Sequence, residues 1–138
     1  MKKYFFVLLI LTLCNCSNDQ FNNSNPFIPN YNFTISINTD LPTYNNLKFA
    51  SNGMYIPNAG ARGIIVFNTT GSAYLAYDAA CPNQALSACS TMFVNGINAK
   101  CSCENAEYNL FTGQCPGKEY PMKPYQVEVN GAVVRIYN

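Results

Sequence analysis

Two Asn-Gly pairs, Asn95-Gly96 and Asn130-Gly131, constrain the fold most strongly, because short apolar stretches flank each of them. A type I′ hairpin turn needs a positive φ at both central residues, and Asn and Gly tolerate this best. The second pair separates residues 125–129, in which apolar and polar side chains alternate, from residues 132–137, which are nearly all apolar. We therefore predict two β-hairpins, the second of which is central to the core.

The remainder of the domain is typical of short strands separated by Pro, Asn and Gly. Residues 33–37 alternate strictly between apolar and polar side chains, as half-buried strands do. No stretch has the 3.6-residue periodicity of an ordinary helix, and no internal repeat is visible. The 138 residues are enough for one packed domain, which we predict to be all-β. Further strands are expected at 47–49, 54–56, 63–67 and 73–77.

The first residues have the composition of an export signal. Lys2 and Lys3 supply positive charge, and residues 5–13 form an apolar run that is too short to cross a bilayer comfortably. We predict a lipoprotein signal peptide over residues 1–15. Export would place the domain in a compartment where disulfides form and persist.

Two cysteines follow this run, in the sequence Leu13-Cys14-Asn15-Cys16, which resembles a bacterial lipoprotein processing site. We predict that Cys16 carries the lipid, with Cys14 as the alternative, since neither follows the usual Gly or Ala. A secretory leader without a lipid is the third possibility. The lipid would attach the protein to a membrane of the bacterial cell envelope, on the periplasmic side or at the surface. Residues 16–31, rich in Asn, Ser and Pro, are expected to be a flexible tether to a folded domain over 32–138.

Charge and residue types exclude several classes of function. Without Lys2 and Lys3 the chain has six basic and seven acidic side chains, and no basic stripe suits nucleic acid. The chain contains no histidine that could act as a base for a Ser or Cys nucleophile, and its acidic residues are scattered singly. We therefore expect no enzymatic activity.

Five cysteines lie within the predicted domain. In an exported protein, cysteines in turn-rich loops indicate either a disulfide framework or a metal site. Spacing alone does not fix their connectivity. They are Cys81, Cys89, Cys101, Cys103 and Cys115.

Four segments occur in the order and spacing of a known family. They are Cys81-Pro82-Asn83, Cys101-Ser102-Cys103-Glu104, residues 108–113 with a Thr-Gly turn, and the closing hairpin over 124–133. Together they resemble the Rieske family, whose loops carry C-x-H and C-x-x-H motifs. The resemblance covers residues 60–138. It implies an antiparallel β-sandwich with two cysteine-bearing loops at the position of the cluster-binding subdomain.

The departures from this pattern bear directly on function. Cys81 and Cys101 match the two cysteine ligands of the family, whereas Asn83 and Glu104 stand at its two histidine positions. A Rieske centre depends on two imidazoles bound to one iron. The chain therefore resembles a divergent member that lacks both histidine ligands, and we expect it to bind no metal or cofactor.

The same resemblance implies two disulfides. The family's iron joins the loops of Cys81 and Cys101, so without iron these cysteines are candidates for a disulfide. Some Rieske proteins have a second bridge between the loops, and Cys89 and Cys103 resemble that pair. Cys115 is then left over, and a shuffled pairing with Cys89 or Cys103 stays open.

Two hypotheses follow for function. The first is a non-catalytic binding or structural module at the cell envelope, with the cluster lost and an unknown protein or glycan partner. The alternative is an electron-transfer protein that holds a [2Fe-2S] cluster or another metal through non-standard ligands. Such ligands would be Cys81, Cys101 and neighbouring cysteines. An association with oxidoreductases rests on the family resemblance alone.

Overall fold

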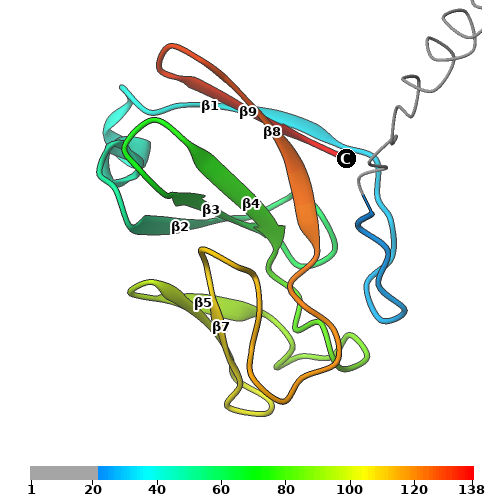
Figure 1. Cartoon of the computed structure of the whole chain (residues 1–138). Helices are drawn as coiled ribbons and strands as arrows, with labels where there is room; N and C mark the ends of the chain where they lie inside the picture. The colour runs from blue at the N-terminus through cyan, green and yellow to red at the C-terminus, as the bar shows by residue number, and fades with distance from the viewer. Residues whose placement is uncertain (1–21) are drawn as a thin grey trace, which may run out of the picture.

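The computed structural model describes residues 22–138, so the predicted signal peptide, Cys14 and Cys16 lie outside the described residues. Within this range the chain forms nine β-strands and one short 3₁₀ helix (Figure 1). In the same range, no helix has the length and apolar character needed to span a membrane. The prediction of an all-β domain is confirmed.

Six antiparallel strands form a sheet that curls into two layers, in the order β1-β9-β8-β4-β3-β2. Strand β8 belongs to both layers, because Tyr125 pairs with Ala76 on β4 while Gln126 to Asn130 pair with β9. In Figure 1 the layer of β1, β9 and β8 lies above the layer of β2, β3 and β4. The strands are β1 (Thr34–Asn38), β2 (Asn52–Ile56), β3 (Ile64–Asn68), β4 (Tyr74–Asp78), β8 (Pro124–Asn130) and β9 (Val133–Tyr137).

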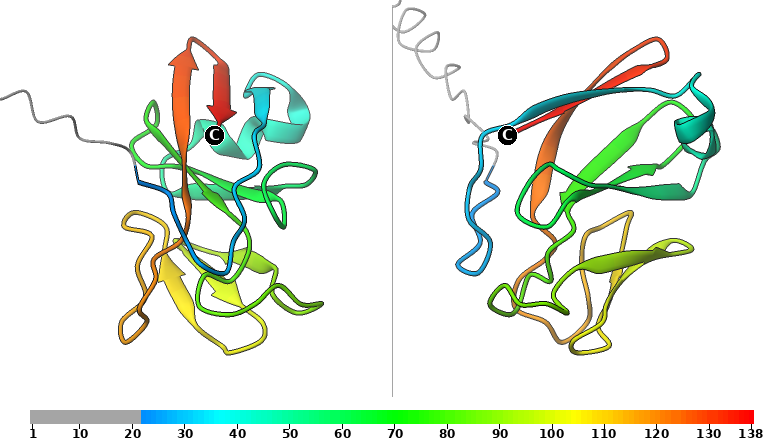
Figure 2. Two further views of the ribbon diagram at one scale, coloured as in Figure 1. Left: turned by 90° about the vertical axis from the view of Figure 1, so that its right-hand side faces the viewer. Right: turned by 180° about the vertical axis from the view of Figure 1, so that it is seen from behind.

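A second sheet of three antiparallel strands lies at one end of this sandwich (Figures 1 and 2). It consists of β5 (Met92–Asn95), β6 (Asn98–Cys101) and β7 (Glu107–Asn109). Three loops accompany it: loop A (79–91) after β4, loop B (102–106) after β6 and loop C (110–123) after β7. All the cysteines of the domain lie in these loops or, for Cys101, at the end of β6.

Strand β3 is buried over its whole length because it separates two apolar clusters. Ile64 and Val66 face the cluster between the layers of the large sheet, whereas Ile65 and Phe67 face the cluster shared with the small sheet. Side chains of a strand alternate between faces, so a strand with two buried faces is apolar throughout. The terminal hairpin contributes to one cluster only and leaves its outer side chains exposed. The central strand of the core is therefore β3, not the terminal hairpin.

Both predicted hairpins are confirmed, but the type I′ assignment is wrong. Asn95 and Asn130 are the last paired residues of their strands, so the two-residue loops are Gly96-Ile97 and Gly131-Ala132. In each hairpin only the glycine has a positive φ, 61° for Gly96 and 59° for Gly131. The turn is shifted by one residue because each Asn pairs across the ladder.

The strand expected at 47–49 is also wrong, because residues 42–48 form the 3₁₀ helix η2 (Pro42–Lys48). Pro42 favours a helical start, since its ring fixes φ near the helical value. The helix places Leu47 in the core, fully buried. The Leu47 carbonyl accepts hydrogen bonds from Asn68 Nδ2 at 2.7 Å and from the Tyr74 hydroxyl at 3.0 Å.

Residues 22–31, the described part of the predicted tether, pack against the domain and are called here the N-terminal strap (blue in Figure 1). Ile28 is 2% exposed, and Asn25 Oδ1 accepts hydrogen bonds from the amides of Phe27 and Ile28. Lys123 Nζ donates to the carbonyl of Asn23 at 2.7 Å and to the side chain of Asn30. Packing on the domain therefore begins before residue 32, because these contacts satisfy polar groups of the strap.

Candidate functional site

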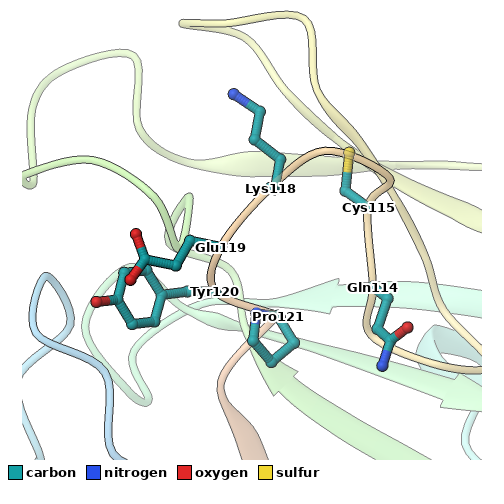
Figure 3. A pocket seen from close by; sticks show the side chains of 6 residues that line it. All are labelled: Gln114, Cys115, Lys118, Glu119, Tyr120 and Pro121. Carbon is teal, nitrogen blue, oxygen red and sulfur yellow. The ribbon is translucent and has the colours of Figure 1, made fainter.

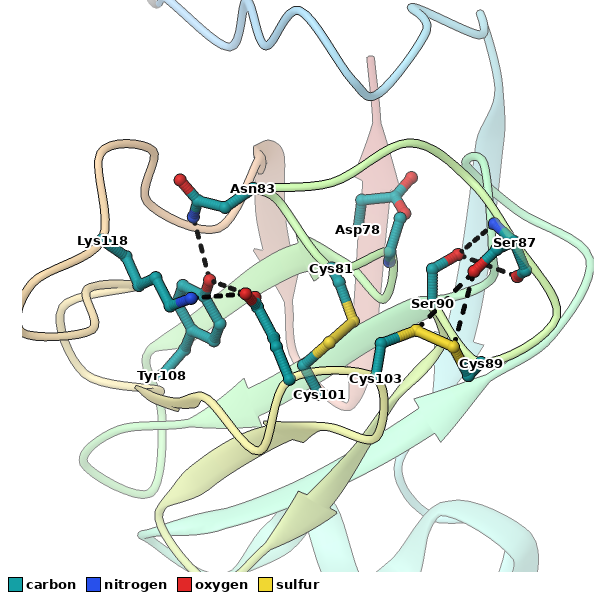
Figure 4. The surroundings of a disulfide bond; sticks show 12 residues. Asp78, Cys81, Asn83, Ser87, Cys89, Ser90, Cys101, Cys103, Tyr108 and Lys118 are labelled. Carbon is teal, nitrogen blue, oxygen red and sulfur yellow. Dashed lines mark hydrogen bonds and ion pairs between the residues drawn. A yellow bond between two sulfur atoms is a disulfide. The ribbon is translucent and has the colours of Figure 1, made fainter.

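Two disulfides join loop A to the region of loop B (Figure 4). Cys81 is bonded to Cys101 with a Cα–Cα distance of 5.7 Å, and Cys89 is bonded to Cys103 with a distance of 5.3 Å. These are the two pairs that the family resemblance implies. Cys115 pairs with neither Cys89 nor Cys103, so the structure contains no shuffled arrangement.

The backbone positions the inner disulfide. The Cys81 amide donates to the Ser90 carbonyl at 2.8 Å, which folds loop A back beside the isolated β-bridge between Ala80 and Thr91. The Cys101 amide, at the end of β6, donates to the Ala106 carbonyl at 2.9 Å and closes loop B. Both cysteines are 0% exposed. The inner disulfide is therefore part of the apolar cluster under the small sheet.

Asn83 uses its whole amide group to connect the loops. Its Nδ2 donates to the Tyr108 hydroxyl at 2.9 Å and to the Tyr120 carbonyl at 2.7 Å. Its Oδ1 accepts from the Tyr120 amide at 2.9 Å. This one side chain of loop A thereby binds the backbone of loop C and the end of a side chain from β7.

Glu104 continues the same chain of contacts. The Tyr108 hydroxyl donates to Glu104 Oε1 at 3.4 Å, and Lys118 Nζ forms an ion pair with Glu104 Oε2. Figure 4 shows Asn83, Tyr108 and Lys118 on one side of the inner disulfide. We call these three residues, together with Glu104, the polar network. It links loops A, B and C, so the two residues that the resemblance aligns with the family's histidines, Asn83 and Glu104, hold the loops together.

Tyr108 lies at the centre of this network and is fully buried. Burial raises its pKa to about 12; the hydrogen bond from Asn83 lowers it, and the carboxylate of Glu104 raises it. The phenol therefore stays protonated at neutral pH. A protonated hydroxyl can accept from Asn83 and donate to Glu104 at the same time, as the network requires.

The residues that the resemblance places at the four ligand positions do not fit a Rieske cluster. Such a cluster needs two thiolates and two imidazoles. Here the sulfurs of Cys81 and Cys101 are bonded to each other, and Asn83 and Glu104 are engaged with Tyr108, Tyr120 and Lys118. Among the described residues, no group of three or more His, Cys, Asp or Glu side chains is placed to hold a metal ion.

A pocket of about 250 Å³ lies beside the network, in loop C (Figure 3). Cys115 is half-buried and is the one free cysteine in the described part of the chain. Its Sγ lies 3.8 Å from the Pro116 carbonyl. The pocket offers amide, thiol, ammonium and carboxylate groups to solvent. Its lining residues are Gln114, Cys115, Lys118, Glu119, Tyr120 and Pro121.

Sequence reasoning missed several residues of the site. It located Asn83 and Glu104 but not their partners Tyr108, Tyr120 and Lys118. It also treated Asp78 as one of several scattered acids, although Asp78 is fully buried. The Asp78 carboxylate accepts from the Tyr125 hydroxyl at 2.7 Å and from the amides of Ala61 and Ala80, which fixes the start of loop A. The available signal in the sequence was an acidic residue directly after the apolar stretch 73–77.

Comparisons with known proteins bear on the fold. No protein-family model matches the chain, and no curated protein matches it. Several solved structures match the chain. One is a chain of the complex of reduced oxygenase and oxidized ferredoxin in carbazole 1,9a-dioxygenase, with 18% identity and a TM-score of 0.50 over 75% of this chain and 92% of that chain.

Two other similar structures are more distant. The Sphingomonas yanoikuyae B1 ferredoxin is 16% identical, with a TM-score of 0.46 over 65% of this chain and 88% of its own. A putative NADH-dependent nitrite reductase small subunit from Mycobacterium tuberculosis is 10% identical, with a TM-score of 0.48 over 79% of this chain and 97% of its own. The first structure, together with the curled antiparallel sandwich and its two cysteine-bearing loops, shows that the chain has a Rieske-like fold.

Proposed function

We propose that this protein is a lipid-anchored component of the bacterial cell envelope whose Rieske-like loops have lost the [2Fe-2S] cluster and act as a non-catalytic binding or structural module. The disulfide between Cys81 and Cys101 carries this proposal. Iron binds cysteine as the thiolate, and a sulfur in a disulfide is not a thiolate. Both cysteine-ligand positions are thus committed to a covalent bond.

The covalent bond and the polar network perform the structural task of a metal. The disulfide closes a loop with a sequence separation of 20 residues, which stabilises the fold by about 3 kcal/mol in the chain-entropy model. Asn83 and Glu104 then hold loop C against loops A and B through Tyr108 and Lys118. The loops therefore need no metal to keep their arrangement.

Loops held in this way suit a binding surface. Ordering a flexible loop costs conformational entropy on association, so loops that are already fixed lose less entropy when they bind a partner. The pocket of Figure 3 offers Gln114, Lys118 and Glu119 as hydrogen-bonding groups for a polar partner. We propose a protein or a glycan as that partner.

Intact-mass spectrometry of the full-length protein, with and without reductant and alongside iron and zinc assays, tests this function. A metal-free protein that gains about four hydrogen masses on reduction supports two disulfides and the module without a cluster. Stoichiometric iron that is lost on denaturation would reject it and make the protein an electron carrier with non-standard ligands.

A gain-of-function variant examines the same proposal from the opposite direction. Asn83→His with Glu104→His supplies the two missing imidazoles. We expect this double variant to recover iron binding only when Cys81 and Cys101 are reduced. Failure to bind iron after reduction, both in this variant and in the same variant with Lys118→Gln, would mean that the loops have diverged from the geometry of the family.

The lipid anchor needs a separate test. Metabolic labelling with a fatty acid, followed by membrane fractionation, should show a labelled protein in the membrane fraction. We expect Cys16→Ala to abolish labelling and Cys14→Ala to leave it unchanged. The reverse result would move the lipid to Cys14, and label on neither cysteine would exclude the anchor.

A further inference from the structure

The two disulfides differ in their access to solvent. Cys81 and Cys101 are 0% exposed, whereas Cys89 is exposed and Cys103 is half-buried. Thiol–disulfide exchange begins when a thiolate reaches one sulfur of the bond, so its rate depends on access. An external thiol can therefore reach the outer disulfide and not the inner one.

A hydroxyl group lies beside both sulfurs of the outer disulfide. Ser87 Oγ is 3.5 Å from Cys89 Sγ and 3.6 Å from Cys103 Sγ (Figure 4). A tight turn fixes Ser87, because its amide donates to Ser90 Oγ at 2.8 Å and its carbonyl accepts from the same Ser90 hydroxyl at 2.9 Å. The Ser87 hydroxyl can thus donate to a sulfur that becomes anionic, and hydrogen bonds to charged acceptors are stronger than those to neutral ones.

A positive charge lies against the same turn. Arg62 Nη2 donates to the Ser87 carbonyl at 2.8 Å. Arg62 Nε is buried and has no hydrogen-bond partner among the described residues. Reactive cysteines are typically found in partly exposed, electropositive surroundings of this kind. The inner disulfide is instead embedded in an apolar cluster.

We propose that the disulfide between Cys89 and Cys103 is a redox-active site that exchanges with an external dithiol, a function separate from the module described above. One thiolate of the dithiol attacks Cys89 Sγ, so a mixed disulfide forms and the bond to Cys103 breaks. Cys103 leaves as a thiolate, to which Ser87 donates a hydrogen bond. The second thiolate of the dithiol then attacks its partner sulfur and releases Cys89.

The overall exchange is balanced. The dithiol is oxidised to its disulfide, and Cys89 and Cys103 gain two electrons from it and two protons through solvent. The inner disulfide keeps loops A and B joined during this cycle, because its sulfurs are out of reach. Reduction at the outer site therefore frees the segment around Ser87 and leaves the domain folded.

Differential alkylation of the full-length protein tests this proposal. N-ethylmaleimide first blocks every free thiol, including that of Cys115; dithiothreitol is then added, and iodoacetamide labels the thiols that appear. We expect Cys89 and Cys103 to be labelled first, and Cys81 and Cys101 at least about tenfold more slowly, because exchange needs access to sulfur. Labelling of all four at one rate, or of the inner pair first, would overturn the proposal.

A matched pair of variants tests the role of the hydroxyl. Ser87→Ala removes the hydroxyl beside the sulfurs. Ser102→Ala removes the hydroxyl of an exposed residue between Cys101 and Cys103, which makes no hydrogen bond with the described residues. We expect Ser87→Ala to slow reduction of the outer disulfide about fivefold, since the leaving thiolate loses a donor. Ser102→Ala should react at the rate of the unaltered protein. Equal rates for the two variants would remove Ser87 from the site.

Discussion

Replacing Asn83 with alanine tests whether the polar network holds the loops together. The change removes three hydrogen bonds, one to the Tyr108 hydroxyl and two to the backbone of Tyr120. Tyr120 is half-buried, so water can replace the lost side chain at its amide and carbonyl. Tyr108 is buried, and in the described part of the chain its hydroxyl then keeps only the 3.4 Å contact with Glu104.

The expected loss of stability follows from these contacts. Each hydrogen bond contributes about 1 kcal/mol net, so three of them set an upper value of about 3 kcal/mol. Water at Tyr120 recovers part of this, and the remaining acceptor at Tyr108 limits the cost of leaving a buried hydroxyl unpaired. We therefore expect Asn83→Ala to lower the free energy of unfolding by about 2 kcal/mol.

Urea unfolding with both disulfides intact measures this loss. A small single domain with intact disulfides usually unfolds in one transition, which permits a direct comparison of free energies. The control is Asn45→Ala, since Asn45 is exposed on η2 and its side chain makes no hydrogen bond within residues 22–138. We expect the control to change stability by less than about 0.5 kcal/mol.

A loss for Asn83→Ala no larger than that of Asn45→Ala would refute the reasoning. It would mean that the inner disulfide alone fixes the loops, and that the amide at position 83 is incidental. Hydrogen exchange adds a local measure. The Tyr120 amide, bonded to Asn83 Oδ1, should lose protection in the variant while the amides of β3 keep theirs.

Three further perturbations test other parts of the fold. Gly60→Ala should lower the free energy of unfolding by more than Gly131→Ala. Both glycines have a positive φ, but only at Gly60 would a Cβ press on a buried carboxylate and hydroxyl. Urea unfolding compares the two variants. Lys123→Met should free the N-terminal strap, whose oxygens accept from Nζ, so protease should cleave 22–31 while the domain stays folded. The free energy of unfolding should fall as pH rises from about 10 to 12, because the unfolded chain releases a tyrosine proton that folded Tyr108, with a pKa of about 12, retains. Urea unfolding measured across this pH range should show a smaller fall in Tyr108→Phe.

Local patterns were enough to predict most of the strands. Alternation predicted β1, and the Asn-Gly pairs predicted the hairpins of β5 with β6 and of β8 with β9. They could not give the turn register, since an Asn can either end a strand or occupy the turn. Only cross-strand pairing, which is a property of two segments, decides between these.

The elements that were missed are ordered by contacts distant in sequence. Leu47 lies in a helical turn because its carbonyl accepts hydrogen bonds from the side chains of Asn68 and Tyr74, which lie on two different strands. The N-terminal strap has the composition of a flexible segment, yet Lys123 near the other end of the chain binds it. Composition does not reveal partners of this kind, because each residue satisfies a polar group about twenty to a hundred positions away.

In the candidate site too, the sequence located some residues but not the contacts that they make. The family pattern located Asn83 and Glu104, but not what they bind, because the pattern defines ligand positions and not the side chains that surround them. Lys118 has no local signal at all. It matters because the carboxylate of Glu104 attracts its ammonium.

This pairing has a consequence for any attempt to restore the cluster. Glu104→His removes the counter-charge of Lys118 and leaves an unpaired ammonium beside the new imidazole, where it would repel a bound iron ion and compete for the space of the loop. Asn83→His also releases loop C, because the backbone of Tyr120 loses both its bonds to the amide. Two histidines therefore supply ligands while they loosen the loop that should cover them. Replacing Lys118 with Gln in the double variant removes the unpaired charge, so if the loops otherwise retain the family's geometry, the reduced triple variant should bind iron more tightly than the reduced double variant.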